Sequence, residues 1–412
     1  MIERYEIITM ANQLGLNPDT VEKDYVLNWL LWGIYQQPHF VNQWLFKGGT
    51  CLKKCFFETF RFSEDLDFTL LDEAHLSVDF LREQFNEITR LIYDETGIEF
   101  FQENFKFKVL SKDKGKLSAQ GVIHYNGPLR RKQTPTPNFA SIKLDLTNNE
   151  KVVLTPIEKR VHHPYSDEPG QGISATCYAF EEVIGEKIRA LAERARPRDL
   201  YDVIHFFRNR SMIENIALLQ DVIQQKCLFK KIAFPTYEII QQHKKIEELS
   251  AQWHHMLAHQ LPVLPSLDSF WEDLEPFFAW LENTLKTYDL PSYNAQLEEV
   301  SFQPGRIHRA LAFDATLQKI QFAAANRLCI EFYYNNKLRL IEPLSFRKPS
   351  NGNALLYGYE LVANTQQIKA FAISKIQDLQ TTNASYMERD YPIEISISGK
   401  IVMPPIRRKN NR

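Results

Sequence analysis

Two aspartates, Asp65 and Asp67, are separated by a single residue on a predicted apolar β-strand. On a strand, side chains two residues apart project from the same face, so both carboxylates lie together while Leu66 and Phe68 face the core. Carboxylate oxygens are hard ligands that suit Mg²⁺ or Mn²⁺. The spacing therefore predicts a site for one or two divalent cations.

A glycine pair, Gly48 and Gly49, precedes the aspartates at the end of another predicted strand, and a helix is predicted to begin near Thr50. Without Cβ atoms, the pair lets a triphosphate approach its backbone N–H groups, and the helix offers its positive end to phosphate. We expect Arg61 to pair with phosphate or with the carboxylates, and Ser63 to orient one carboxylate. Together these features predict a site that binds an NTP and orients its α-phosphate for in-line attack.

Each motif alone has an ordinary explanation. Two aspartates spaced in this way commonly mark a solvated strand edge or a turn, and Gly-Gly pairs are common in turns. Their conjunction favours nucleotide chemistry.

The same residues resemble a known family. The runs KGGT (47–50) and RFSEDLDF (61–68) resemble the first motif of the AbiEii-type nucleotidyltransferases, toxins of abortive-infection and type IV toxin–antitoxin systems within the polymerase-β-like superfamily. The resemblance covers about residues 15–210, with the stretch between the two runs one residue longer than usual, which predicts a longer helix. Two further parts of the chain carry it: residues 21–25 and residues 182–202.

The resemblance implies an α/β (α+β) polymerase-β-like nucleotidyltransferase domain. It implies that Lys187 contacts the nucleotide phosphates, that Arg194 balances charge, and that Asp199 and Asp202 orient the basic residues and brace two helices. It further implies tRNA as the probable acceptor, at its 3′ end, and an antitoxin protein as partner.

Asp145 is the candidate for a third carboxylate. Polar and apolar residues alternate over 142–146, so Lys143 and Asp145 share one face of a predicted strand. Polymerase-β-like sites commonly carry a carboxylate on a neighbouring strand, where it completes the metal shell and accepts the attacking hydroxyl's proton. The alternative is an exposed strand aspartate that pairs with a lysine.

Periodicity predicts three domains: residues 1–175 form an α/β core with N-terminal helices, 176–290 a helical bundle that carries Lys187, and 304–412 a small β-barrel with a basic tail. Resemblance to known domains implies that the core is the nucleotidyltransferase domain and that the barrel is Sm/SH3-like. In the core we expect a helix at 76–93 and strands at 105–110, 121–125, 140–146 and 151–156. In the bundle we expect helices at 198–209, 213–225, 237–255 and 267–288. In the last domain, a helix at 314–326 precedes strands at 328–334, 337–343, 354–363 and 368–373.

The last domain resembles a WYL domain, which implies sensing of a nucleotide or nucleic-acid ligand. Arg339 and Lys375 occupy its basic positions. The triplet that names the domain is absent, because residues 354–356 read Ala-Leu-Leu. An assembly surface without a ligand is the alternative.

Composition indicates a cytoplasmic protein without a membrane segment. The 412 residues carry a net charge of -2, so any nucleic-acid binding must rest on local basic patches. Five scattered cysteines indicate reduced thiols. We interpret Cys51 and Cys55 as core residues, and His255 and His259 as structural, because no third zinc ligand is evident. Basic patches occur at Lys106, Lys108, Lys112, Lys114 and Lys116, at 130–132, and at Arg407, Arg408, Lys409 and Arg412.

The sequence thus predicts a metal-dependent nucleotidyltransferase that transfers NMP from an NTP to an acceptor. The resemblance implies that it is a toxin in phage defence and that the acceptor is the 3′ end of tRNA. Two alternatives remain open. The first is a non-catalytic regulator that senses an NTP or nucleic acid through the WYL-like domain. The second is nucleotidylation of a partner protein.

Overall fold

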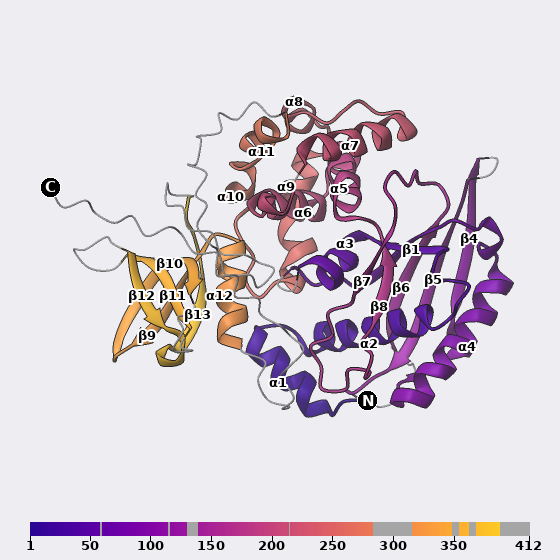
Figure 1. Ribbon diagram of the computed structural model, residues 1–412, viewed down its shortest axis with the longest axis horizontal. Coiled ribbons are helices and arrows are strands. Elements are labelled where there is room, and N and C mark those ends of the chain that lie inside the picture. Colours follow the sequence, from indigo (N-terminus) through magenta and orange to yellow (C-terminus); the bar gives the residue numbers. More distant parts are fainter. Residues whose placement is uncertain are drawn as a thin grey trace. The chain divides into compact units, whose positions relative to one another are not determined.

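The computed structural model describes residues 1–57, 60–113, 116–129, 139–213, 215–282, 315–347, 354–361 and 368–387. Contacts divide the chain into two compact units (Figure 1). The first comprises Met1–Val203 and Ile213–Pro262, and the second Ile204–Met212 and Val263–Arg412. The predicted division at 1–175, 176–290 and 304–412 stays a prediction.

A mixed sheet forms the centre of the first unit, with strand order β3-β5-β6-β2-β1-β8-β7 and β4 paired to β5. Strand β2 lies in the middle, parallel to β6 and antiparallel to β1. The aspartates of β2 therefore sit at the centre of the sheet and not on an exposed edge. The strands are β1 (Trp44–Lys47), β2 (Asp65–Leu70), β3 (Glu99–Phe100), β4 (Lys106–Asp113), β5 (Lys116–Asn126), β6 (Ala140–Thr147), β7 (Ile157–Arg160) and β8 (Ser174–Cys177).

Helices pack against this sheet. Helix α2 (Pro18–Tyr35) contacts β6 and β8, and it also packs against α1 (Arg4–Leu14) and α4 (Val78–Thr96). It begins with Asn17, whose side chain accepts a hydrogen bond from the Asp19 N–H at 2.9 Å, an ordinary N-cap. Helix α4 confirms the predicted helix at 76–93 within a few residues at each end, and its strongly one-sided apolar pattern gives the buried face.

The helix after the glycine pair is short and then widens. Helix α3 (Gly48–Cys51) continues as a π-helix at Leu52–Phe56, where the Phe57 N–H donates to the Leu52 carbonyl at 2.7 Å. We expected the extra residue in this stretch to lengthen the helix. A wider turn takes it up instead, as π segments do inside helices.

The alternation predicted over residues 142–146 is confirmed. In β6, Ile142, Leu144 and Leu146 are buried, Lys143 is exposed and Asp145 is half-buried.

The strand predicted at 151–156 is wrong: this segment is a loop, and β7 begins only at Ile157. The carboxylate of Glu182 accepts the N–H groups of Val153 at 3.0 Å and Leu154 at 2.6 Å. These groups therefore do not pair with a strand. Lys226 lies 2.6 Å from Glu182, and both side chains are buried, so a side-chain anchor replaces the strand ladder here.

The remaining helices of the first unit follow the predicted pattern with one break. Helices α5 (Phe180–Arg194) and α7 (Ile216–Lys230) pack on each other, and the unit boundary falls within α6 (Pro197–Arg208). The segment predicted as one helix at 237–255 is two, α8 (Tyr237–Gln241) and α9 (Ile246–Leu257).

In the second unit, Arg208 at the end of α6 joins several segments. Its Nε lies 2.8 Å from the Asp273 carboxylate, and Arg327 lies 2.9 Å from the same group. Arg208 also donates to the carbonyls of Ser269 at 2.8 Å and Asn326 at 3.1 Å. These bonds connect α6 with α10 (Leu267–Trp271), with α11 (Leu274–Leu281) and with the turn after α12 (Ala315–Ala325).

The C-terminal strands form an antiparallel sheet of order β12-β11-β10-β9-β13. Four of them match the predicted strands, whereas β13 was not predicted. Within the described part of the chain, β12 and β13 are the two edge strands and do not pair with each other. The sheet is therefore open there, and the predicted barrel is not formed. The strands are β9 (Leu328–Tyr334), β10 (Lys337–Arg347), β11 (Leu355–Glu360), β12 (Ile368–Ala372) and β13 (Gln377–Ser385).

Several predicted features fall outside the described residues. These are the basic residues at 130–132, Lys114, the side chains of Lys112 and Lys116, the end of the helix predicted at 267–288, and the basic tail at Arg407, Arg408, Lys409 and Arg412. Of the first patch, Lys106 and Lys108 are exposed on β4. None of the described helices is long and apolar enough to cross a membrane.

The Glu182 anchor gives a first prediction. Glu182→Ala removes the acceptor of two N–H groups and one partner of a buried lysine, and such a change costs about 3–5 kcal/mol of stability. We expect a lower unfolding temperature and faster amide hydrogen exchange over residues 151–156. Glu182→Gln is the matched control, because it keeps an oxygen acceptor and should lose less. Equal exchange rates in the alanine variant and the wild type would contradict the anchor.

Candidate functional site

The glycine pair lies between two functional side chains. Gly48 has φ +81°, a left-handed conformation that favours glycine, and a Cβ there would lie 2.1 Å from Oδ2 of Asp67. A Cβ on Gly49 would lie 2.6 Å from Nη2 of Arg61 and 3.3 Å from Oγ of Ser63. The missing side chains thus allow Asp67 and Arg61 to approach the backbone, a use of the pair that the sequence did not predict.

Three carboxylates share one face of two neighbouring strands. Asp67 on β2 stands beside Asp145 on parallel β6, and Asp65 stands beside Lys143. Because paired residues of neighbouring strands point to the same face, Asp65, Asp67 and Asp145 lie together. The predicted position of Asp145 next to the pair is thereby observed, and its Oδ1 accepts a hydrogen bond from Gln120 at 3.2 Å.

The three aspartates do not close into one tight ligand shell. Among the described residues, the group whose possible ligand atoms all lie within 4.8 Å of one another consists of three cysteines. The carboxylates are grouped on one face, where Asp145 accepts a hydrogen bond from Gln120 and Asp65 lies 3.9 Å from Arg198.

Electrostatics at this face favour a cation. Burial raises the pKa of Asp67 to about 6, with the charges of Asp145 and Asp65 adding to the effect and Lys47 and Lys187 opposing it. Burial also raises the pKa of Asp65, against the lowering effect of Arg198 and Lys143. A raised carboxyl pKa means that the folded protein holds the negative charge at a cost, and a bound cation would remove that cost.

Lys187 is held in a fixed position. Its Nζ lies 2.9 Å from Asp202 and 3.8 Å from Asp199, both fully buried carboxylates on α6. Arg194, at the end of α5, binds Asp199 through Nε at 2.7 Å and Nη2 at 2.8 Å. Asp199 and Asp202 therefore connect α5 with α6.

The partner of Arg61 differs from the one predicted from the sequence. Instead of pairing with Asp65 or Asp67, it donates to both oxygens of Asp202, from Nε at 2.7 Å and from Nη2 at 2.8 Å. A third bond joins its Nη1 to Gln260 at 3.0 Å, and the side chain is 2% exposed. The structure thus gives Arg61 a bracing position in the interior.

Thr50 and Ser63 line the same turn. The Thr50 hydroxyl donates to the backbone carbonyl of Asp65 at 2.5 Å, which ties the start of α3 to the start of β2. Ser63 is buried beside Gly49.

The N-terminal run at residues 21–25 supports the segments around the site. Lys23 on α2 binds Glu64, the residue before Asp65, at 2.9 Å. Asp24 binds Lys54 of the π-helix at 2.6 Å, and both of those side chains are buried. These residues hold the flanks of the site, and His259 on the other side lies 3.3 Å from Glu64.

Arg198 was not predicted as a site residue. Its Nη1 lies 3.9 Å from Oδ2 of Asp65, and burial lowers its pKa. The sequence does place Arg198 four residues before Asp202, and therefore on the same face of α6, which could have indicated that it lies near the site.

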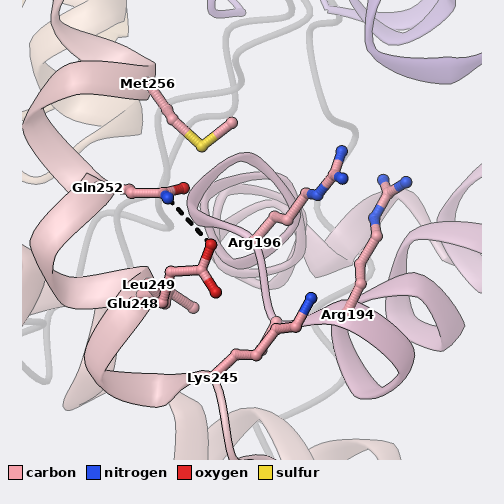
Figure 2. A pocket seen from close by; sticks show the side chains of 8 residues that line it. Arg194, Arg196, Lys245, Glu248, Leu249, Gln252 and Met256 are labelled. Atoms are coloured by element: carbon pink, nitrogen blue, oxygen red, sulfur yellow. Dashed lines mark hydrogen bonds between the residues drawn. The ribbon is translucent and has the colours of Figure 1, made fainter.

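Arg194 also lines a basic pocket with a volume of about 310 Å³. Figure 2 shows Arg194 and Arg196 extending side by side, with Lys245 beneath them and Glu248 hydrogen-bonded to Gln252. Arg194 also lies within electrostatic range of Asp67. Basic side chains thus outnumber acidic ones in this pocket, which is also lined by Ala195, Leu249 and Met256.

The sequence model of the family described as "Nucleotidyl transferase AbiEii toxin, Type IV TA system" matches residues 29–283. The chain belongs to this family. As an AbiEii protein it is a nucleotidyltransferase toxin of a type IV toxin–antitoxin system. Enzymes of this family generally use an NTP and a divalent cation. Membership in a toxin–antitoxin family also implies that a cognate antitoxin is the partner of this toxin.

A solved structure is also similar to this AbiEii chain. It is MenT4, a nucleotidyltransferase toxin from Mycobacterium tuberculosis, with a TM-score of 0.48 and 20% identity over 69% of this chain and 90% of MenT4. Comparison with curated proteins gave no match.

The pKa of Asp67 gives a prediction for metal-free protein. Its folded value of about 6 exceeds the ordinary 3.8, so ionisation of Asp67 costs stability as pH rises through this range, on the order of 2–3 kcal/mol. Asp67→Asn removes that cost. We expect the variant to gain stability relative to wild type between pH 4 and pH 7.5, measured by thermal unfolding with a chelator present. A stability difference that stays constant across this range would contradict the assignment.

Proposed function

We propose that this chain transfers a nucleoside monophosphate from an NTP to the 3′ end of tRNA, and that this arrests growth in phage defence unless an antitoxin neutralises the toxin. One observation carries the chemistry: three carboxylates share one face of β2 and β6, directly beside the left-handed Gly48. Family membership supports nucleotidyl transfer. The acceptor and the defence role are the further steps of the proposal.

The residues at this face fit a divalent cation. Asp65 and Asp67 are partly buried carboxylates with raised pKa values, and they offer the oxygen-only donor set that Mg²⁺ or Mn²⁺ prefers. In the proposal these two aspartates hold the cation and Asp145 assists. When bound, the cation would neutralise triphosphate charge and polarise the α-phosphate.

The chain's own groups would do the rest. The hydroxyl of the acceptor attacks the α-phosphorus, Asp145 accepts its proton, and pyrophosphate leaves. Lys187, fixed by Asp202, stabilises the charge that grows on the leaving phosphates, and the backbone N–H groups of Gly48 and Gly49 contribute beside it. Loss of one such contact typically lowers the rate by about 100-fold.

The basic pocket supports a polynucleotide acceptor. Arg194, Arg196 and Lys245 line this pocket, the charge of Asp67 acts on Arg194, and phosphate groups of RNA are bound by such basic side chains. The net charge of -2 means that this local patch, and not the whole chain, would have to attract RNA.

Two other functions remain as outcomes of the test. Transfer to a protein hydroxyl would use the same carboxylates. A sensing function would use the C-terminal sheet as a WYL-like ligand domain, but Arg339 there is bound to Glu360 at 2.5 Å, and Lys369 pairs with the same carboxylate. Lys375 is exposed on the turn after β12.

The test follows α-³²P label from each of the four NTPs into total bacterial RNA and into lysate protein, with Mg²⁺ or Mn²⁺. We expect label in tRNA with wild type and its loss in Asp65→Ala and Asp67→Ala, because each lacks one proposed metal ligand. Asp72→Ala is the matched control, because Asp72 is an exposed aspartate two residues beyond β2. Label in protein alone would replace the tRNA proposal, and no label with intact NTP binding would favour the sensor.

The pocket is tested separately in the same assay. Arg196→Ala and Lys245→Ala should raise the KM for RNA several-fold and reduce its salt dependence, with the KM for NTP unchanged. Lys244→Ala, an exposed neighbour that does not line the pocket, is the control. Wild-type values for RNA in both pocket variants would remove the pocket from the acceptor site.

A further inference from the structure

Three cysteines from two separate segments meet in the first unit. Cys51 ends α3, Cys55 lies on the π-helix, and Cys177 ends β8. Their sulfur atoms all lie within 4.8 Å of one another, and all three are free thiols. The sequence suggested only that Cys51 and Cys55 share a helix face in the core, since it cannot show that Cys177 arrives 122 residues later at the same point.

We propose that Cys51, Cys55 and Cys177 bind one thiophilic d¹⁰ cation, of the Zn²⁺ or Cu⁺ class. Three thiolates around such a cation, each at about 2.3 Å, stand about 4 Å apart. The observed sulfur positions are therefore within about 1 Å of a trigonal shell. Soft thiolate ligands select these cations over Mg²⁺, which prefers the carboxylates of β2 and β6.

The surroundings suit such a site. Cys51 and Cys177 are buried, while Cys55 is half-buried and gives a route of entry. The three thiols share hydrogen bonds, which lower the pKa of Cys177, as does the charge of Lys159. The pKa values of Cys51 and Cys55 are raised by burial and by the same hydrogen bonds, and binding of a cation would release the remaining thiol protons. Three thiolates and a divalent cation sum to one negative charge, which Lys159 would offset. Cys227 on α7 is also a buried free thiol, and the group of three sulfur atoms does not include it.

The cation would connect the two segments that carry the glycine turn. Cys177 pairs with Phe46 in the sheet, two residues before Gly48, and Cys51 lies three residues after it. A bond through the metal would thus fix α3 and the π-helix to β8, and the wider π turn places Cys55 in this cluster. Because the unfolded chain does not hold these thiols together, binding should stabilise the fold.

The test titrates Cd²⁺ into the full-length, reduced, metal-free protein and follows the ultraviolet thiolate-to-cadmium absorption band. We expect saturation at one Cd²⁺ per chain and a rise in unfolding temperature. Cys177→Ala should lose the band or weaken binding at least about 10-fold, whereas Cys227→Ala, an equally small change at another buried cysteine, should behave as wild type. Displacement of Cd²⁺ by Zn²⁺ or by Cu⁺ then identifies which cation of the class the site prefers.

Two outcomes would overturn the proposal. The first is a fully reduced wild-type protein, its free thiols confirmed by titration, that shows no cadmium band. The second is a band of unchanged affinity in Cys177→Ala. Thermal unfolding of metal-free Cys177→Ala, with Cys55→Ala as a second variant at the half-buried position, shows whether a lost band reflects a lost ligand or a lost fold.

Discussion

The candidate site depends on the contacts that the carboxylate of Asp202 makes with Arg61 and Lys187. This carboxylate is fully buried, accepts two hydrogen bonds from Arg61 and forms an ion pair with Lys187. Two cationic side chains from distant parts of the chain therefore share one carboxylate. A buried ion pair is costly to break, because the partner left behind stays charged in the interior. Arg61 precedes β2, Lys187 belongs to α5 and Asp202 to α6, so this one group sets the position of the lysine relative to Asp67.

Charge in the first unit is organised in two zones. On one side, Asp65, Asp67 and Asp145 share one face of β2 and β6, and burial raises the pKa of Asp67 there although Lys47 and Lys187 lower it. On the other side, buried lysines and glutamates balance one another: Lys47 binds Glu186 at 2.9 Å and Lys226 binds Glu182 at 2.6 Å. In the second zone the buried charges neutralise one another, whereas the partly buried carboxylates of the first zone would be stabilised by a bound cation.

The sequence predicted those features of the site that depend on the spacing of residues within one strand or one motif. The period-2 pattern placed Asp65 and Asp67 on one strand and Asp145 on another, and family motifs pointed to Lys187. Contacts between distant segments were beyond such patterns. The partner of Arg61 is 141 residues away, the loop at 151–156 depends on a glutamate of α5, and Cys177 reaches Cys51 only through the sheet. In each case tertiary contact, and not propensity, decides the outcome.

The central claim is that Asp65 and Asp67 hold the divalent cation of nucleotidyl transfer. Its most direct test is Mn²⁺ binding, measured by electron paramagnetic resonance with a non-hydrolysable NTP present, for wild type, Asp67→Asn and the exposed control Asp72→Asn. We expect Asp67→Asn to weaken Mn²⁺ binding at least about 10-fold and Asp72→Asn to leave it unchanged. Equal Mn²⁺ affinity in wild type and Asp67→Asn would contradict it.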